Sequence, residues 1–289
     1  MNRMAFSPLS CWAMILVVVL ASGFDVALSH SDVGGPSFSY NTMSFDGPEN
    51  WGKLSPAYKE CGEGKAQSPI DIVTANAVPN PSLDNLTRVY APTVATLNNN
   101  GKDISMTFQD HEGHSVSPGT ILVCNPDGSM KAFGFKMIHW HSPSEHTIDG
   151  QRFPLELHLV HASEDGHLAV IGILYKIGDH DAFYDQLEDK LRELKTEHRV
   201  AAGLVELKSL QKRTGSYFRY MGSLTTPPCT ENVIWNILGK VREISAEQLQ
   251  LLTAPLPHKD NRPAQPLNGR TVQFYSPPNS TVSFQNISQ

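Results

Sequence analysis

The chain has 289 residues and a formal net charge of −6, and this length is enough for one large domain or two small ones with an ample core. The negative charge gives no reason to expect nucleic acid or an anionic membrane as a partner. Only 18% of the residues are charged, and 21 glycines and 20 prolines indicate many turns. A single β-rich domain fits this composition.

The N-terminus has the plan of a secretory signal peptide. Arg3 precedes the apolar run Cys11–Ala21, which small residues follow and which is too short to span a membrane. We expect residues 1–23 to be the signal, cleaved between Ser22 and Ser31; an uncleaved signal anchor is the alternative. The protein is then secreted, or enters the lumen of an organelle on the secretory route, and we expect no membrane anchor.

Two further features fit that route. Removal of the signal leaves three cysteines, enough for one disulfide and one odd thiol in an oxidising compartment: Cys61, Cys124 and Cys229. Three Asn-x-Ser/Thr sequons make glycosylation at one or more of them an expectation: Asn85, Asn279 and Asn286. The domain is predicted over residues 36–278, with a polar tail at 279–289.

In chain order, the sequence first predicts short strands separated by turns such as Asn100-Gly101 and Asp149-Gly150. The predicted strands are Arg88–Thr96, Ile104–Phe108, His114–Val116, Thr120–Val123, Lys131–His141, Phe153–His161 and Leu168–Tyr175. An amphipathic helix is predicted over Asp181–Leu194. A loop over residues 222–229 leads into a strand at Asn232–Leu238, and Ser245 with Gln248 predicts a capping box that begins a second helix.

Two of these strands carry a histidine pattern. Side chains two positions apart on a strand share a face, so His139 and His141 project together, as do Glu156, His158 and Val160. If the strands are neighbours, three imidazoles converge. Three nitrogens with an open fourth position are typical of catalytic zinc. Glu156 could then accept the second ring N–H of His158 and fix its orientation.

Each part of this pattern is weak alone, because a single strand histidine is usually an ordinary polar side chain. The His-x-His pair with a spaced Glu-x-His pair is stronger, since such apolar strands have little reason to aim imidazoles inward unless something pairs with them. A zinc protease is not supported, because the sequence has no His-Glu-x-x-His helix.

Five motifs in order make the chain resemble the α-class carbonic anhydrases, of the secreted plant, algal or bacterial kind, over about residues 38–275. They are Gly47-Pro48-Glu49-Asn50-Trp51, Gln67-Ser68-Pro69-Ile70, His139-Trp140-His141-Ser142-Pro143-Ser144-Glu145-His146, Glu156-Leu157-His158-Leu159-Val160-His161 and Ser223-Leu224-Thr225-Thr226-Pro227-Pro228. The resemblance implies a mainly β fold with short helices. It centres on a large, twisted, mostly antiparallel sheet of about ten strands, with the metal at the base of a conical cleft.

The resemblance also implies Zn²⁺ on His139, His141 and His158. In such enzymes zinc lowers the pKa of its bound water to about 7, and the hydroxide attacks carbon dioxide to give bicarbonate and a proton, with slow ester hydrolysis as a side activity. Thr225 matches the threonine that orients the hydroxide and passes its own proton to a carboxylate, matched by Glu145.

The remaining site residues are likewise implied by the resemblance. Thr226 lies on the rim beside Thr225. The carbon dioxide pocket is matched by Val160, Val170, Leu224 and Trp235, each of which could from sequence alone be plain core. Cys61 and Cys229 match a disulfide of secreted members, which leaves Cys124 as the odd thiol, buried or reactive.

The chain departs from the family at two positions. Lys102 stands where fast members have a proton-shuttling histidine, and a lysine with a pKa of about 10.4 relays protons poorly at neutral pH. Met137 replaces a glutamine that accepts from the first zinc histidine. The alternative function is a non-catalytic storage or matrix relative, although such relatives typically lose a zinc ligand.

Overall fold

The computed structural model describes residues 35–124, 128–211 and 215–277. The predicted signal peptide, the polar tail and the sequons at Asn279 and Asn286 lie outside these residues. Among the helices of the described part of the chain, none is both long and apolar enough to cross a membrane.

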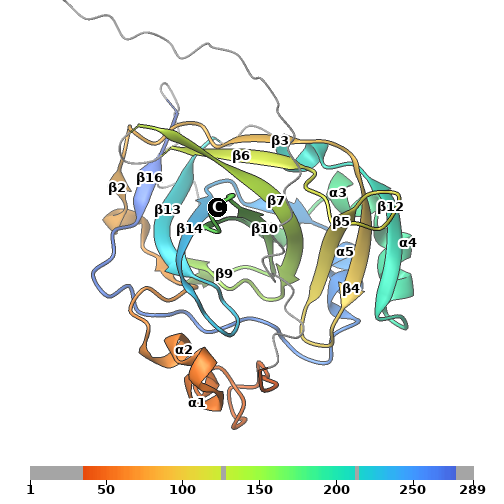
Figure 1. The fold of residues 1–289 in the computed structure, drawn as a ribbon, viewed down its shortest axis with the longest axis horizontal. Helices are drawn as coiled ribbons and strands as arrows, with labels where there is room; N and C mark the ends of the chain where they lie inside the picture. Colours follow the sequence, from red (N-terminus) through yellow and green to blue (C-terminus); the bar gives the residue numbers. More distant parts are fainter. Residues whose placement is uncertain (1–34, 125–127, 212–214, 278–289) are drawn as a thin grey trace, which may run out of the picture.

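One mixed sheet of thirteen strands dominates the described residues (Figure 1). Its hydrogen-bonded path runs through β12 (Arg199–Val205), β4 (Thr93–Asn99), β5 (Ile104–Gln109), β7 (Met130–His141), β10 (Leu155–Ala162), β11 (Leu168–Ile177), β14 (Glu231–Leu238), β13 (Tyr217–Ser223), β16 (Gln273–Tyr275) and β2 (Val78–Pro79). Off this path, β15 (Arg242–Ile244) pairs with β11, while β6 (Gly119–Cys124) joins β7 to β3 (Thr87–Tyr90). Only the pairs β11–β14, β11–β15 and β16–β2 of this sheet are parallel, so the predicted mainly antiparallel sheet is confirmed.

The remaining elements are small. A second sheet holds β1 (Asp71–Ile72), β8 (Thr147–Ile148) and β9 (Gln151–Arg152). The helices are α1 (Trp51–Leu54), α2 (Glu60–Glu63), α3 (Ala182–Asp185), α4 (Glu188–Leu194) and α5 (Ala246–Thr253), with 3₁₀ turns η1 (Pro56–Tyr58), η2 (Thr74–Asn76) and η3 (Lys208–Gln211). Helices α3, α4 and α5 gather at one side of the sheet, away from α1 and α2 (Figure 1). The predicted capping box of α5 is present, with Ser245 and Gln248 bonded to each other's backbone.

Three predicted elements were wrong in extent. The strand predicted over Arg88–Thr96 is two strands, β3 and β4, which Pro92 separates because it has no N–H for a ladder. Only an isolated bridge at Ser115 represents the strand predicted at His114–Val116. The helix predicted over Asp181–Leu194 is divided into α3 and α4, because the Leu187 N–H bonds three residues back to Tyr184 and tightens the turn there.

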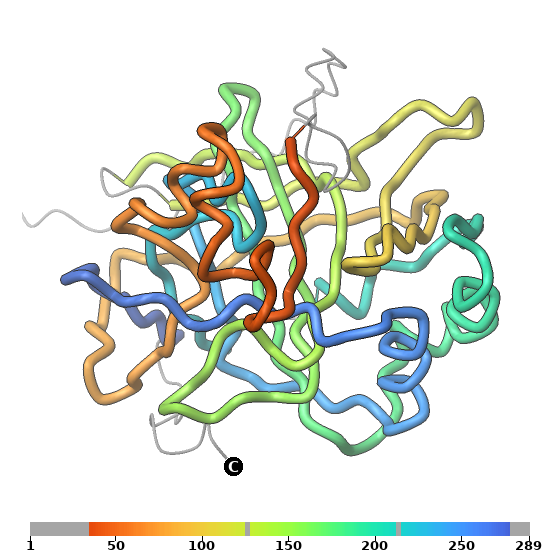
Figure 2. Tube along the Cα trace, turned by 90° about the horizontal axis from the view of Figure 1, so that it is seen from below, coloured from red at the N-terminus to blue at the C-terminus, as the bar shows by residue number. Residues whose placement is uncertain are grey.

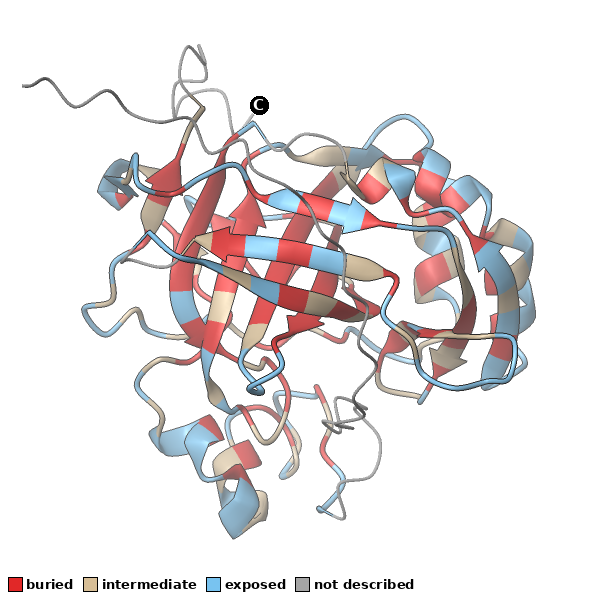
Figure 3. Ribbon diagram, turned by 45° about the horizontal axis from the view of Figure 1, so that its top comes forward, coloured by how far each residue is buried: buried red, intermediate tan, exposed pale blue. Residues whose placement is uncertain are grey.

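The central strands are buried on both faces, which is why their sequences are almost continuously apolar. All eight residues of β10 are buried, and Figure 3 shows buried residues along the central strands. One core includes Ile138 and Trp140, while Met137 and Val160 belong to a second core. Alternation along β7 therefore places His139 and His141 on the same side as the second core.

His161 lies on the same face of β10 as Leu157 and Leu159, and a register shift after Val160 places it opposite Phe135. Its ring stacks on Phe135 at 4.7 Å between centroids, its Nε2 lies 2.8 Å from the Tyr90 hydroxyl, and its Nδ1 lies 3.3 Å from the Ala169 carbonyl oxygen. Burial, opposed by the backbone hydrogen bonds, lowers the pKa of His161 to about 3.

The low pKa of His161 predicts a loss of stability in acid. The unfolded chain takes up this proton as pH falls through about 6.5, whereas the folded chain takes it up only near pH 3. The folded state therefore loses up to about 1.4 kcal/mol per pH unit across that window from this residue. Denaturant unfolding of the wild type and His161→Gln between pH 7 and 3 should give a flatter profile for the variant; parallel profiles would contradict the prediction.

Candidate metal centre

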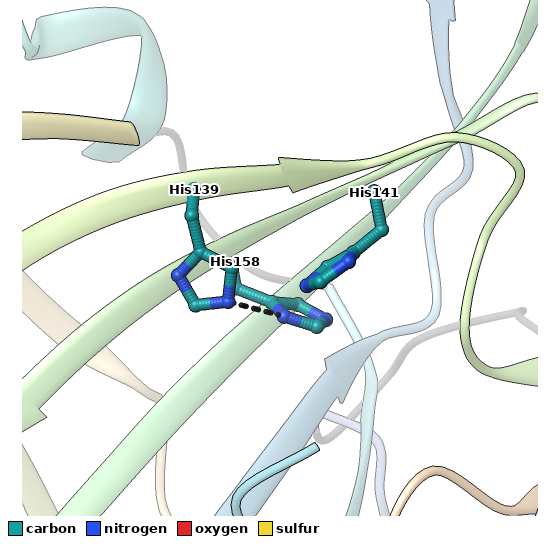
Figure 4. A group of neighbouring side chains, drawn as sticks. All are labelled: His139, His141 and His158. Carbon is teal, nitrogen blue, oxygen red and sulfur yellow. Dashed lines mark hydrogen bonds between the residues drawn. The ribbon is translucent and has the colours of Figure 1, made fainter. Parts of the chain in front are cut away.

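The three predicted histidines converge in the structure. Strands β7 and β10 are antiparallel neighbours, with His158 directly opposite His139 and Glu156 opposite His141. The three side chains offer nitrogens that lie within 4.8 Å of one another, and all three residues are buried (Figure 4). His158 Nδ1 lies 3.0 Å from His139 Nε2. Two nitrogens of a tetrahedral zinc site are about 3.3 Å apart, so the donor atoms fit such an ion.

Hydrogen bonds identify which ring nitrogens carry a lone pair. His141 Nδ1 lies 2.6 Å from the carbonyl oxygen of Asp260, and His158 Nε2 lies 2.8 Å from a carboxylate oxygen of Glu156. Because these oxygens accept, each histidine nitrogen facing them donates its N–H, and His141 Nε2 and His158 Nδ1 keep the lone pairs that a metal needs. Burial, only partly offset by Glu156, lowers the pKa of His158 and favours the neutral ring.

Glu156 is held by four donors. One oxygen faces His158 Nε2 at 2.8 Å and His146 Nδ1 at 2.7 Å, while the other accepts from the backbone N–H groups of Glu145 and His146, both at 2.8 Å. Burial alone raises the pKa of this carboxyl, but the two histidines outweigh it and hold the pKa well below its usual range. Glu156 is thus an ionised acceptor that fixes the ring of His158 in place.

The structure also brings Glu145 and Thr225 together. Burial raises the pKa of Glu145 to about 7, against His158, the Arg262 backbone N–H and a hydrogen bond from the Thr225 hydroxyl, all of which lower it. Glu145 Oε1 accepts from the Arg262 N–H at 2.8 Å, and Oε2 lies 3.4 Å from His141 Nε2. A cation held by the histidines would favour the ionised carboxylate further.

An apolar pocket adjoins this polar group. The residues that line it are Met137, His139, Val160, Val170, Leu224, Thr225 and Trp235, and they include the four apolar residues that the resemblance assigns to the carbon dioxide pocket. Val160 and Val170 face each other across β10 and β11, and Val170 pairs with Trp235 across β11 and β14. Thr226, by contrast, is buried in its loop, where its carbonyl accepts from the Cys229 N–H.

The position of the Lys102 side chain does not favour a role as a proton relay. Its ammonium lies 4.4 Å from the centre of the Phe38 ring, a cation–π contact. Met137 lines the pocket beside His139. A thioether, which is a weak hydrogen-bond acceptor, therefore takes the place of the family's glutamine.

Sequence reasoning missed the segment that follows α5. Residues 254–272 contain no helix or strand, yet Asp260 and Arg262 within it contact His141 and Glu145. The Arg262 guanidinium donates to Gln67 Oε1 and to the carbonyl oxygens of Ser68 and Cys61. Figure 2 shows this blue segment crossing the molecule next to the red N-terminal segment. The sequence Lys259-Asp260-Asn261 is typical of a surface loop. Only the next residue, Arg262, which a proline follows, could have indicated that this segment has a buried role.

The predicted disulfide is present between Cys61 and Cys229, 168 residues apart. It joins α2 to the loop that carries Thr225, and so ties the N-terminal segment to the site. Cys124 keeps its thiol, which donates to the carbonyl oxygen of Ser82 at 3.5 Å.

A trio of buried imidazoles on neighbouring strands, beside an apolar pocket and on a large mixed sheet, defines a β protein with a candidate metal centre of the carbonic anhydrase type. A family model for eukaryotic-type carbonic anhydrase matches residues 46–276, and the chain belongs to this family.

Relatives support the assignment along nearly the whole chain. Alpha carbonic anhydrase 7 of Arabidopsis thaliana is 38% identical over 281 residues, which cover 94% of this chain and 98% of the relative. Among solved structures, dioscorin complexed with ascorbate aligns with a TM-score of 0.78 and 36% identity, covering 85% of this chain and all of the other. The α-carbonic anhydrase of Thermovibrio ammonificans with the inhibitor sulfanilamide aligns with a TM-score of 0.72 and 37% identity, covering 83% and all, respectively.

Proposed function

We propose that this protein is a zinc enzyme that catalyses the reversible hydration of carbon dioxide to bicarbonate and a proton. The observation that carries the proposal is the convergence of three buried imidazole nitrogens next to a pocket walled by valine, leucine and tryptophan. His139, His141 and His158 would hold Zn²⁺. When bound, zinc supplies the Lewis acidity that makes water a nucleophile at neutral pH.

The protein's own residues do the remaining work. Carbon dioxide has no net dipole, so the side chains of Val160, Val170, Leu224 and Trp235 bind it without a charged contact. In this proposal the Thr225 hydroxyl, which lowers the pKa of Glu145, donates its hydrogen to that carboxylate, and the threonine oxygen is then left to accept a hydrogen bond and orient the nucleophile. Glu156 keeps His158 in the neutral tautomer that a metal requires.

A stopped-flow hydration assay on the purified protein, with zinc content measured alongside, tests the proposal. We expect about one zinc per chain and hydration that a sulfonamide abolishes; ester hydrolysis should be slow and equally sensitive. A chain that binds zinc stoichiometrically but hydrates carbon dioxide no faster than buffer would sink the enzyme assignment.

A binding role without catalysis is the second candidate, because a dioscorin structure with ascorbate is similar to this chain. The convergence of the three histidines, with Glu156 beside His158 and Glu145 beside His141, supports the enzyme over this second candidate. Calorimetric titration with ascorbate separates the two: binding by a zinc-loaded chain that lacks hydration activity supports the second candidate.

Proton export is expected to limit turnover, because Lys102 takes the place of the family's relay histidine and its ammonium lies against the Phe38 ring. In weak buffer, kcat should therefore rise with the concentration of an imidazole-type buffer, and Lys102→His should raise kcat and flatten that response. The histidines that could replace Lys102 as a relay, His111, His114, His167 and His180, all lie outside the pocket lining. A flat response in the wild type would mean that another route carries the proton.

We also propose that the chain enters the secretory route, a proposal supported by the Cys61–Cys229 disulfide. Asn85 is exposed in the irregular segment before β3, so it is accessible to glycosylation. Expression in a eukaryotic secretory host should give a mature chain that begins between Ser22 and Ser31 and carries a glycan on Asn85. Mass spectrometry before and after N-glycosidase treatment checks both; an unmodified Asn85 peptide contradicts the second.

A further inference from the structure

Asp260 contacts the end of β7 at two points. Its backbone carbonyl oxygen lies 2.6 Å from His141 Nδ1, and its carboxylate oxygen Oδ1 accepts from the backbone N–H of Ser142 at 2.7 Å. The first contact uses the main chain and would survive any substitution. The second depends on the side chain, and it fixes the peptide unit that directly follows His141.

The Asp260 carboxyl occupies this place against an electrostatic cost. Asp260 is 2% exposed and lies near the equally buried Asp103. The guanidinium of Arg262 is bonded to Gln67 and to carbonyl oxygens instead. Burying a carboxyl group without a neighbouring cation is costly, so we infer that the contact made by Asp260 matters to the fold or to the site.

The Ser142 amide is the element that needs this acceptor. It is the first amide after β7, so no ladder position of that strand holds it, and a part-buried N–H without an acceptor costs about 1–3 kcal/mol. Loss of the acceptor would let the peptide after His141 reorient toward another partner. His141 is the residue directly before Ser142, so the His141 ring would move with that peptide.

We propose that the Asp260 side chain is a positioning residue for the metal centre: by accepting from the Ser142 N–H, it holds His141 in the orientation that zinc requires. The inference rests on the proposed function in taking zinc as the bound metal. Groups that orient metal ligands typically contribute about 10- to 100-fold to metal affinity. The relevant property is the acceptor oxygen, not the charge.

Zinc affinity of the full chain tests this directly, by competition for Zn²⁺ with a chelator. Asp260→Ala, which removes the acceptor, should weaken zinc binding about 10- to 100-fold. Asp260→Asn keeps an oxygen at the same place and should stay within about threefold of wild type. Gln265→Ala, in the same segment but bonded to Pro263, is the matched control and should bind zinc as the wild type does.

Two further measurements separate positioning from general stability. The unfolding midpoint of each zinc-free variant shows whether it is folded under the assay conditions, and the absorption spectrum of the Co²⁺-loaded protein reports ligand geometry. We expect an altered Co²⁺ spectrum for Asp260→Ala and an unchanged one for Asp260→Asn. If Asp260→Ala does not fold, Asp260→Glu, which keeps the charge but displaces the oxygen, should show the same loss of affinity.

The outcomes distinguish the inference from the function beneath it. Equal zinc affinity in Asp260→Ala and wild type overturns the inference and leaves the enzyme proposal intact. An equal loss in Asp260→Asn and Asp260→Ala also overturns it, because charge rather than the acceptor would then matter. A wild-type chain that binds no zinc overturns both.

Discussion

His139→Ala should abolish stoichiometric zinc binding and lower kcat/KM for carbon dioxide hydration by roughly three orders of magnitude or more. The substitution removes one of three nitrogens that lie within 4.8 Å of one another. The Lewis acidity of a bound metal is worth several kcal/mol of transition-state stabilisation, and each 1.36 kcal/mol is about tenfold in rate. Metal analysis and stopped-flow hydration measure the two effects.

A matched histidine makes that result specific. His111→Ala removes an exposed imidazole and should leave zinc content and hydration unchanged. Zinc retained at about one per chain in His139→Ala, with normal turnover, would contradict the assignment of the ligands.

Thr225→Val should lower kcat/KM by about 100-fold while zinc content stays the same. Valine has nearly the shape of threonine but cannot donate to Glu145, so the nucleophile loses its fixed orientation. Misplacement of reacting groups by about 1 Å costs on that order. Stopped-flow kinetics with parallel zinc analysis separates this effect from metal loss.

The partner residue provides the test of mechanism. Glu145→Gln should cause a loss of similar size, and the double variant should be little worse than either single one, because both remove the same hydrogen bond. Additive losses would show that Thr225 and Glu145 act separately.

The histidine motifs were readable from sequence because strand geometry leaves few choices. Once Met137–His141 is a strand, His139 and His141 must share a face, and the same holds for Glu156 and His158. The sequence left one condition open, namely that the two strands are neighbours. The observed register meets it by placing His158 opposite His139.

Local sequence was weaker where one residue changes the outcome. Pro92 split a predicted strand, and a tightened turn at Leu187 split a predicted helix. Neither departure affects the site, because β7, β10, β11 and β14 carry the histidines and most of the pocket, and the loop after β13 carries Leu224 and Thr225.

The sequence by itself determined the β-rich class, the metal-binding residue types and their shared faces, since these follow from periodicity and side-chain chemistry. Only the tertiary structure decided that Asp260, more than 100 residues from His141 in the sequence, contacts the His141 ring, and that Lys102 contacts Phe38. The reason is physical: periodicity acts between neighbours in the chain, whereas contacts made by an irregular segment depend on where the whole sheet places it.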